Sequence, residues 1–250
     1  MNNTIKKQLE HRSIRKFTDQ PISREILNTL FEVANRTASS VAMQSYSIIR
    51  ITDKRIKEEI SEVCKQEYIK DTPEFLIFIV DIFRNAKIAE EMGEDFRVKR
   101  DMDKFFQGFT DGSLAAQNMY TAIESLGLGA VFFGSILNDT TKIIELLNLP
   151  QYTFPIVGLG FGYPNQKPEL KPRMKMSLKV YDNKYKTQDN YLDSIKDYDQ
   201  EMNQYYDLRN TKKPLDSFSK QVVGQFKNPN PKRIKLLNVI RSQGFDLKLD

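Results

Sequence analysis

The stretch His11-Arg12-Ser13-Ile14-Arg15-Lys16-Phe17 holds three cations, a serine hydroxyl and the only histidine of the chain. Guanidinium groups bind phosphate through two parallel hydrogen bonds, and a serine hydroxyl can add a neutral one. Ile14 and Phe17 interrupt the polar residues, so they can anchor the segment against a core while its neighbours face an anion. The stretch therefore indicates an anion-binding turn, and the alternative is a solvated basic turn without a ligand.

Length and composition indicate a soluble globular protein. The chain has 250 residues, of which 40% are apolar and 28% are charged, enough for one large domain or two small ones. No apolar run reaches the length of a membrane span, and the first residues lack the apolar segment of a signal peptide. Cys64 is the only cysteine, and with His11 it cannot form a zinc site alone. We therefore expect a cytoplasmic protein with no metal and no membrane partner.

The positive charge is concentrated in the last third of the chain. Residues 165–250 contain 18 Lys and Arg against 11 Asp and Glu, whereas residues 1–164 contain 20 against 22. A basic region suggests an anionic partner, which could be nucleic acid, a membrane surface or a phosphorylated small molecule. Pro, Lys, Tyr and Asn become frequent after Pro164. We therefore divide the chain into a core at 1–164 and an extension at 165–250 that packs on the core and on a partner subunit.

Hydrophobic periodicity predicts alternating helices and strands, which is an α+β layer structure. The spacing of apolar and capping residues predicts helices over residues 4–9, 23–34, 53–65, 103–126, 138–147, 192–208 and 234–243. Strands are predicted over residues 46–52, 75–80, 130–134 and 154–164. Residues 75–80 are apolar at every position, which is typical of a central strand buried on both faces. The helix at 103–126 is apolar on more than one stripe, so it should be deeply buried or pack against a second subunit.

Other segments carry weaker signals. Residues 82–100 are charged and broken, so we expect a mobile excursion there, and the polar break at 209–214 separates the last two helices. The run Gly158-x-Gly160-x-Gly162 follows a strand, but its spacing is not the dinucleotide fingerprint and Pro164 stands where a helix should begin. We interpret these glycines as packing positions.

The familiar catalytic arrangements are missing from the sequence. The one histidine lies among cations that disfavour a general base, the carboxylate pairs lie in charged helical surroundings, and there is no Walker loop. What is present is a set of anion and amide donors: the basic turn, Ser39-Ser40, Gln44, Gln66, Gly127-Leu128-Gly129 and Lys171-Pro172-Arg173. An anion cradle without acid–base machinery often indicates that a cofactor does the chemistry. Singly, each of these pieces is more commonly structural.

Taken in order, several segments share the pattern of one family. These are residues 11–23, 44–54, 115–118, 124–129 and 170–173, with Tyr205-Tyr206-Asp207-Leu208-Arg209 in the tail. Together they resemble the FMN-dependent nitroreductases, and more narrowly the oxygen-insensitive NADPH-dependent branch that includes flavin reductases. The resemblance implies a nitroreductase-like fold: a central mixed, mainly antiparallel sheet flanked by helices, a long central helix at a dimer interface and a C-terminal helical extension. It also implies a homodimer with two FMN sites between the subunits.

The same resemblance assigns the cofactor site. The positions that match FMN-binding residues of the family are His11, Arg12, Ser13, Arg15, Ser39, Gln44, Gln66, Gly129, Ala130, Val131, Lys171 and Arg173. The first four match a phosphate and ribityl cradle, and the glycine and its two neighbours match a strand edge beside the isoalloxazine ring. The last two match cations near the phosphate and the N1–C2 side of the ring, where positive charge stabilises the negative charge that develops during hydride transfer.

The resemblance also implies the reaction. Arg209, Lys212 and Lys213 match a tail segment that binds NADPH, with the arginine on its extra phosphate. NADPH passes a hydride to flavin N5, and a nitroaromatic, quinone or free flavin then takes two electrons in a ping-pong cycle without a protein catalytic residue. Two departures stand out: Ala130 replaces a family glycine, and the two lysines replace arginines. The segment at 85–106 matches poorly and shapes the substrate opening in this interpretation.

Two alternatives remain open from the sequence. A flavin-binding protein of this kind could be a non-catalytic sensor or storage protein. Alternatively, the basic tail could be a nucleic-acid-binding module, although its acids are interleaved with its bases and it carries no known binding motif. We prefer the enzyme, with small-molecule acceptors as partners and no nucleic acid.

Overall fold

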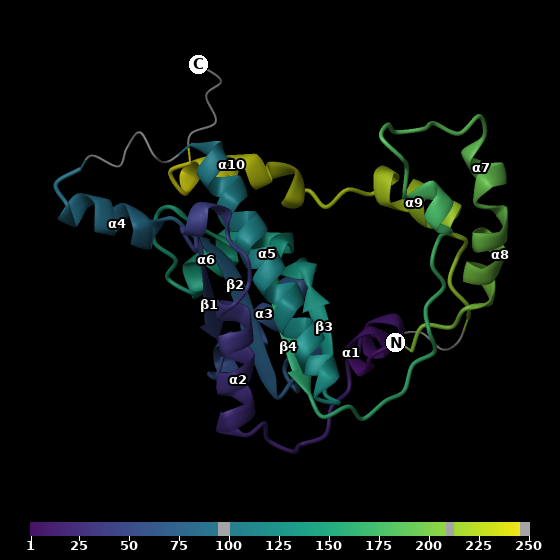
Figure 1. The fold of residues 1–250 in the computed structure, drawn as a ribbon, viewed down its shortest axis with the longest axis horizontal. Coiled ribbons are helices and arrows are strands. Elements are labelled where there is room, and N and C mark those ends of the chain that lie inside the picture. The colour runs from purple at the N-terminus through teal and green to yellow at the C-terminus, as the bar shows by residue number, and fades with distance from the viewer. Residues whose placement is uncertain (95–100, 209–212, 246–250) are drawn as a thin grey trace. The chain divides into compact units, whose positions relative to one another are not determined.

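The computed structural model describes residues 1–94, 101–208 and 213–245. The chain divides into two compact units, residues 1–167 with 230–250 and residues 168–229 (Figure 1). The last helix therefore belongs to the first unit. The sequence-based division at 164/165 instead placed it in the extension. That division into a core and an extension stays a prediction.

The first unit is built on a four-stranded antiparallel sheet with the order β1-β2-β4-β3. Its strands are β1 (Tyr46–Arg50), β2 (Glu74–Asp81), β3 (Gly129–Phe133) and β4 (Thr153–Gly162). A parallel element is contributed by an isolated bridge between Ser13 and Ala130. The predicted layer structure and its mainly antiparallel sheet are therefore confirmed.

Strand β2 lies between two hydrophobic clusters, one on each face of the sheet, as its continuous apolar sequence predicted. Leu76, Phe78 and Val80 join a cluster with the long helix α5 (Met102–Ser125) and α2 (Arg24–Asn35). The alternate residues Phe75, Ile77 and Ile79 join a second cluster with α3 (Lys54–Cys64) and α6 (Thr140–Leu146). Because successive side chains of a strand point to opposite faces, one strand supplies both layers of the core.

Capping residues place the beginnings of several helices. Ser23, Asp53 and Asp139 cap α2, α3 and α6 with their side-chain oxygens. Helix α1 (Asn3–Leu9) is capped by Asn2 and begins one residue before the predicted start. Each cap satisfies a backbone N–H group that the first helical turn leaves without a partner.

The expectation of a broken segment at 82–100 is wrong for its first half. Residues Phe83–Glu91 form helix α4, whose first turn begins where the Asp81 carboxylate accepts the Arg84 backbone N–H at 3.0 Å. Ala86 is the only buried residue of this helix, so the helix has no buried apolar stripe that periodicity in the sequence could reveal. Residues 95–100 lie outside the described residues.

The second unit contains α7 (Tyr191–Ser194), α8 (Lys196–Gln204) and α9 (Phe218–Lys227). The predicted helix at 192–208 is interrupted at Ile195, and α9 was not predicted because none of its residues is buried. Asp199 joins α8 to α9 by accepting the backbone N–H and the hydroxyl of Ser219 at 2.9 and 2.5 Å.

The chain then returns to the first unit. Helix α10 (Leu236–Ser242) is followed by Phe245, whose ring lies 5.1 Å from the ring of Phe105. The Gln243 carbonyl accepts the Tyr152 backbone N–H at 2.7 Å, and its amide donates to Pro150 and Thr153 at 3.0 Å. Across the described helices, none combines the length and the apolar composition needed to cross a bilayer.

Candidate functional site

The basic turn at 11–17 lies along the outer edge of β3, the last strand of the sheet. The Ile14 backbone N–H donates to the Ala130 carbonyl at 2.8 Å, and Ser13 forms the parallel bridge with Ala130. Phe17 forms a second bridge with Pro164. Ile14 is buried, as the sequence predicted for an anchor. The structure therefore brings together the predicted cradle residues of the turn and the predicted strand edge at 129–131.

A glycine permits this close approach. A Cβ atom at Gly129 would lie 2.7 Å from the Cβ of Ile14, which is closer than real Cβ contacts allow. Gly158, Gly160 and Gly162 on β4 are similarly crowded by Phe133, Thr72 and Pro73. Their interpretation as packing positions is thus confirmed, and it is Gly129 that brings the turn to the sheet.

The histidine of the turn is held by the last turns of α5. His11 Nδ1 lies 2.8 Å from Oε1 of Glu124, and its ring meets the Tyr120 ring edge-on with 5.2 Å between centroids. The Tyr120 hydroxyl donates to the Ala130 carbonyl at 2.6 Å. Burial, and then the Glu124 carboxylate, raise the pKa of Tyr120, so its hydroxyl remains a donor.

Arg12 supplies the observation that points to a ligand. Its Nη1 donates to the Glu10 carbonyl at 2.9 Å, but its buried Nε has no hydrogen-bond partner within the described chain. A buried cationic donor without an acceptor is costly, so such groups normally have a partner. An FMN phosphate is a dianionic acceptor, and the guanidinium, the Ser13 hydroxyl and the half-buried Arg15 beside it are suitable donors. The residues of the turn therefore fit the phosphate end of FMN.

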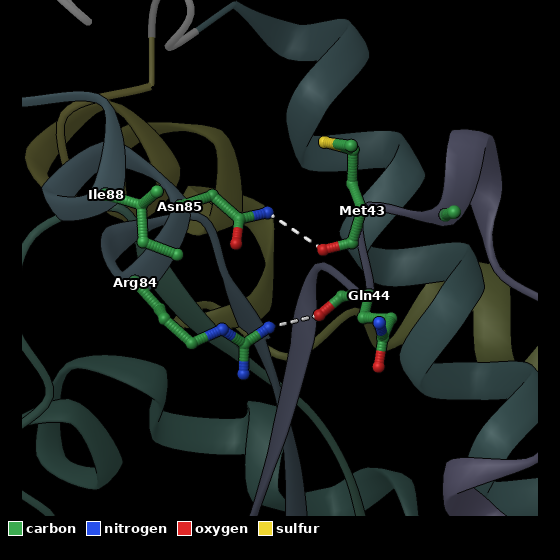
Figure 2. Close-up of a pocket in the computed structure, with 6 residues that line it drawn as sticks. Met43, Gln44, Arg84, Asn85 and Ile88 are labelled. Atoms are coloured by element: carbon green, nitrogen blue, oxygen red, sulfur yellow. Dashed lines mark hydrogen bonds between the residues drawn. The ribbon is translucent and has the colours of Figure 1, made fainter. Parts of the chain in front are cut away.

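Ser39 and Gln44 lie in a separate loop, which contacts α5 at Asp111. Asp111 of α5 accepts the backbone N–H groups of Ser40 and Ser45 at 2.8 and 3.3 Å. Glu124, which holds the turn, lies 13 residues further along the same helix, about 20 Å at 1.5 Å per residue. The loop and the turn of one chain are therefore far apart along α5. The loop lines a hollow of about 510 Å³ together with Arg84, Asn85 and Ile88 (Figure 2).

Gln66 follows the left-handed residue Lys65 that ends α3. Its backbone N–H donates to Ser61 at 3.1 Å, and its side-chain carbonyl accepts the Tyr68 hydroxyl at 2.6 Å. The carboxamide nitrogen is thus turned away from Tyr68, where it can donate to another group. Gln66 is half-buried beside the cluster on the α3 face of the sheet.

The remaining predicted residues belong to the second unit. Lys171 is half-buried and Arg173 exposed in the segment before α7, and Lys213 is exposed. Arg209 and Lys212 lie outside the described residues. The assignment of these five cations to FMN and NADPH therefore stays a prediction.

Three residues of the site were missed from the sequence: Arg84, Asp111 and Glu124. Asp111 had a signal, because it is the one acid between residues 104 and 123 and it is flanked by glycines at 108 and 112 in a largely apolar helix. The sequence carried no signal for Arg84, since its guanidinium donates to backbone carbonyl groups, which every residue has. No group of three or more His, Cys, Asp and Glu side chains that could hold a metal occurs in the described part of the chain.

Comparison with known proteins identifies the family. Residues 9–163 match the model of the nitroreductase family, and residues 171–248 match its C-terminal domain. The chain belongs to the nitroreductase family. It is 36% identical over 245 residues to an NADPH-flavin oxidoreductase of Vibrio harveyi, covering 98% of each chain. It is 34% identical over 249 residues to an FMN reductase (NADPH) of Bacillus subtilis, covering 98% of this chain and 99% of that one.

Solved structures of nitroreductases have the same fold. A nitroreductase from B. subtilis superposes with a TM-score of 0.90 at 33% identity, covering 98% of this chain and 100% of that one. An NADPH:FMN oxidoreductase from Vibrio harveyi, solved with NAD+, superposes with a TM-score of 0.87 at 34% identity, covering 99% and 100%. The fold expected from the basic turn and its companion segments is thus confirmed over nearly the whole chain.

Proposed function

We propose that this nitroreductase is an FMN-dependent oxidoreductase that uses NADPH as reductant. The observation that carries the proposal is the turn at 11–15, beside the edge of β3, where the buried Arg12 Nε has no acceptor among the residues that the structure describes. Curated relatives named NADPH-flavin oxidoreductase and FMN reductase (NADPH) support the same chemistry. The chemistry that FMN supplies when bound is hydride transfer from NADPH, followed by two-electron reduction of an acceptor such as a nitroaromatic, a quinone or free flavin.

The protein contributes binding and orientation. Arg12, Ser13 and Arg15 would hold the phosphate, and His11 is kept beside them by Glu124. Residues 129–131, which are buried in β3, would lie against the ring. Lys171 and Arg173 would place positive charge near the N1–C2 side of the ring. These residues hold charge and position, so we assign no catalytic acid, base or nucleophile to the chain.

We further propose that a homodimer completes the site. The turn and the loop carrying Ser39 and Gln44 are fastened about 20 Å apart along α5, which is too far for both to surround one end of the same cofactor. A second copy of the chain could bring its loop to the turn of the first. Sedimentation of the purified protein measures this: a monomer that still binds FMN at full affinity contradicts the shared site.

The deciding experiment uses the absorption spectrum. Protein purified with excess FMN and then desalted should retain about one flavin per chain, and anaerobic NADPH should bleach the oxidised flavin band. Retained flavin that NADPH leaves unbleached favours the sensor or storage protein. A colourless protein whose nucleic-acid binding falls steeply with salt favours the basic module.

The preference for NADPH is tested separately. If Arg209 binds the additional phosphate of NADPH, Arg209→Ala should raise the Michaelis constant for NADPH much more than that for NADH. Lys213→Ala serves as a weaker variant, since lysine binds phosphate as a point charge. Equal changes for both coenzymes contradict this assignment. A cytoplasmic location stays a prediction.

A further inference from the structure

The loop at 39–45 has an unusual backbone. Val41, Ala42 and Gln44 have φ angles of 44°, 59° and 49°, in the left-handed region that residues with a Cβ rarely adopt. Such conformations persist only where the surroundings determine them, and they concentrate at functional sites. Hydrophobic burial does not determine this loop, because Val41 is 71% and Met43 48% exposed. Polar contacts to its backbone must therefore hold it.

One set of contacts comes from inside the molecule. The carboxylate of Asp111 is 1% exposed, and its two oxygens accept the backbone N–H groups of Ser40 and Ser45. A glycine on the same face of α5 makes room, because a Cβ at Gly108 would lie 2.6 Å from the Ser45 carbonyl oxygen. The amide ends of the loop peptides thus point at a buried negative charge.

A second set comes from helix α4, on the other side of the loop. Figure 2 shows the Arg84 guanidinium donating to the Gln44 carbonyl and the Asn85 amide donating to the Met43 carbonyl, the latter at 3.0 Å. Arg84 is itself oriented by Asp81, whose carboxylate accepts its backbone N–H and lies 3.8 Å from its Nη1. The carbonyl ends of the loop peptides thus point at a positive charge.

We propose that Arg84 and Asp111 are positioning residues that hold the loop in its strained form so that Gln44 can bind FMN. The inference rests on the proposed function and adds two residues that neither touch the phosphate cradle nor belong to the predicted site. Opposite charges on the two sides match the two ends of the peptide dipoles, so the loop is fixed before the cofactor arrives. Fixing a binding loop in advance increases affinity because the loop loses less conformational entropy on binding.

The first test compares variants of α4 in FMN titrations of the apoprotein, followed by flavin fluorescence. Arg84→Ala should weaken FMN binding at least about tenfold, and Arg84→Lys should do so less, because lysine keeps the charge without the planar fork. Lys87→Ala is the matched control, since Lys87 lies one turn later in α4 and its ion pair within the described residues is with Glu90 of the same helix. This variant should bind FMN as the wild type does.

A double-variant cycle separates positioning from a general loss of structure. Gln44→Asn shortens the side chain while tolerating the left-handed φ. If Arg84 acts through Gln44, Arg84→Ala should weaken binding far less in the Gln44→Asn background than in the wild type. A merely structural role predicts the same fold-loss in both backgrounds, and that result overturns the inference.

Asp111→Asn provides an independent test that does not require FMN. The substitution preserves volume but replaces one accepting oxygen with an NH₂ group, so the amides of Ser40 or Ser45 should exchange hydrogen faster in the apoprotein. Unchanged exchange there, with wild-type FMN affinity in Arg84→Ala, overturns the inference while the proposed function stands. If the wild-type protein itself binds no FMN, the proposed function fails and the inference fails with it.

Discussion

The Nδ1 atom of His11 lies 2.8 Å from Oε1 of Glu124, so a histidine–carboxylate pair fastens the N-terminal basic turn to the last turn of α5. The side chain of Glu124 is 13% exposed and that of His11 is 34% exposed, so solvent screens the pair only in part. The pair places a negative charge directly behind a cradle that we assign to a phosphate. We infer that the pair orients the histidine, and variants of Glu124 test this.

Removing the carboxylate should weaken FMN binding modestly. Partly exposed ion pairs contribute about 0.2–1 kcal/mol, so Glu124→Ala should raise the dissociation constant of FMN by up to about fivefold. Glu124→Gln should have a smaller effect, because its amide oxygen can still accept from Nδ1. Glu62→Ala, an exposed position on α3, is the control, and a Glu124→Ala protein that matches it would contradict the orienting role.

Removing the Arg12 guanidinium should weaken FMN binding strongly without unfolding the protein. Each charge-assisted hydrogen bond contributes about 1.5–3 kcal/mol, so Arg12→Ala should raise the dissociation constant about tenfold to a hundredfold. Arg15→Ala should behave similarly. The apoprotein should keep its stability to within about 0.5 kcal/mol, since within the described residues the Arg12 side chain makes one hydrogen bond, to the Glu10 carbonyl.

Isothermal titration of the apoprotein measures this affinity, and urea unfolding measures the stability. Arg24→Ala, an exposed cation in the first turn of α2, is the control. Wild-type affinity in Arg12→Ala would remove the main support for the phosphate cradle.

Adding one methyl group at Gly129 should separate the turn from the sheet. The new Cβ would overlap Ile14, and overpacking of this kind typically costs about 1–3 kcal/mol of stability. Gly129→Ala should therefore lower the free energy of unfolding and the affinity for FMN together. Gly134→Ala is a matched control at the opposite end of β3, because no atom lies within 4 Å of its added Cβ. Equal stability of the two variants would contradict the close approach.

Cys64 should be inert at neutral pH and should make stability fall in alkali. It is 3% exposed, and burial raises the pKa of its thiol to about 11, against a smaller opposite effect of the Ser135 hydroxyl. In the unfolded chain the thiol ionises at about pH 8.5, so above that pH unfolding releases a proton from Cys64. The free energy of unfolding therefore decreases with rising pH until about pH 11.

Comparison of the wild type with Cys64→Ala isolates this effect. Between pH 8 and pH 10 the wild type should lose about 2 kcal/mol more than the variant, because tyrosines contribute equally to both. An aromatic disulfide reagent at pH 8 should react with the thiol only after unfolding. Rapid labelling of the folded protein would show that the thiol is accessible.

The sequence predicted those parts of the fold that bury side chains in a regular pattern. Strand β2, apolar at every position from 75 to 80, lies between two hydrophobic clusters, and helices α2 and α3 lie where the sequence predicted helices. Helices α4 and α9 were not predicted, because one buries a single alanine and the other buries nothing. Without an apolar stripe, a short helix cannot be distinguished from a charged loop by periodicity.

The candidate site likewise contains residues that the sequence predicted and residues that it did not. The basic turn has a composition that indicates an anion site, and Ile14 was correctly expected to anchor it. Asp111 accepts from backbone N–H groups and Arg84 donates to backbone carbonyl groups. Every residue carries these groups, so the residue types of the loop do not reveal these contacts. The distance between the turn and the Gln44 loop depends on where each meets α5, and that follows from tertiary packing alone.

The return of residues 230–245 to the first unit determines how the chain would respond to proteolysis. The second unit, residues 168–229, is inserted between two segments of the first, and Gln243 and Phe245 are held there by Tyr152 and Phe105. A protease that cuts once within the insert therefore generates two fragments that share one core. We expect the nicked protein to migrate as a single species until denatured, whereas a stop codon at residue 230 would leave Phe105 uncovered and favour aggregation.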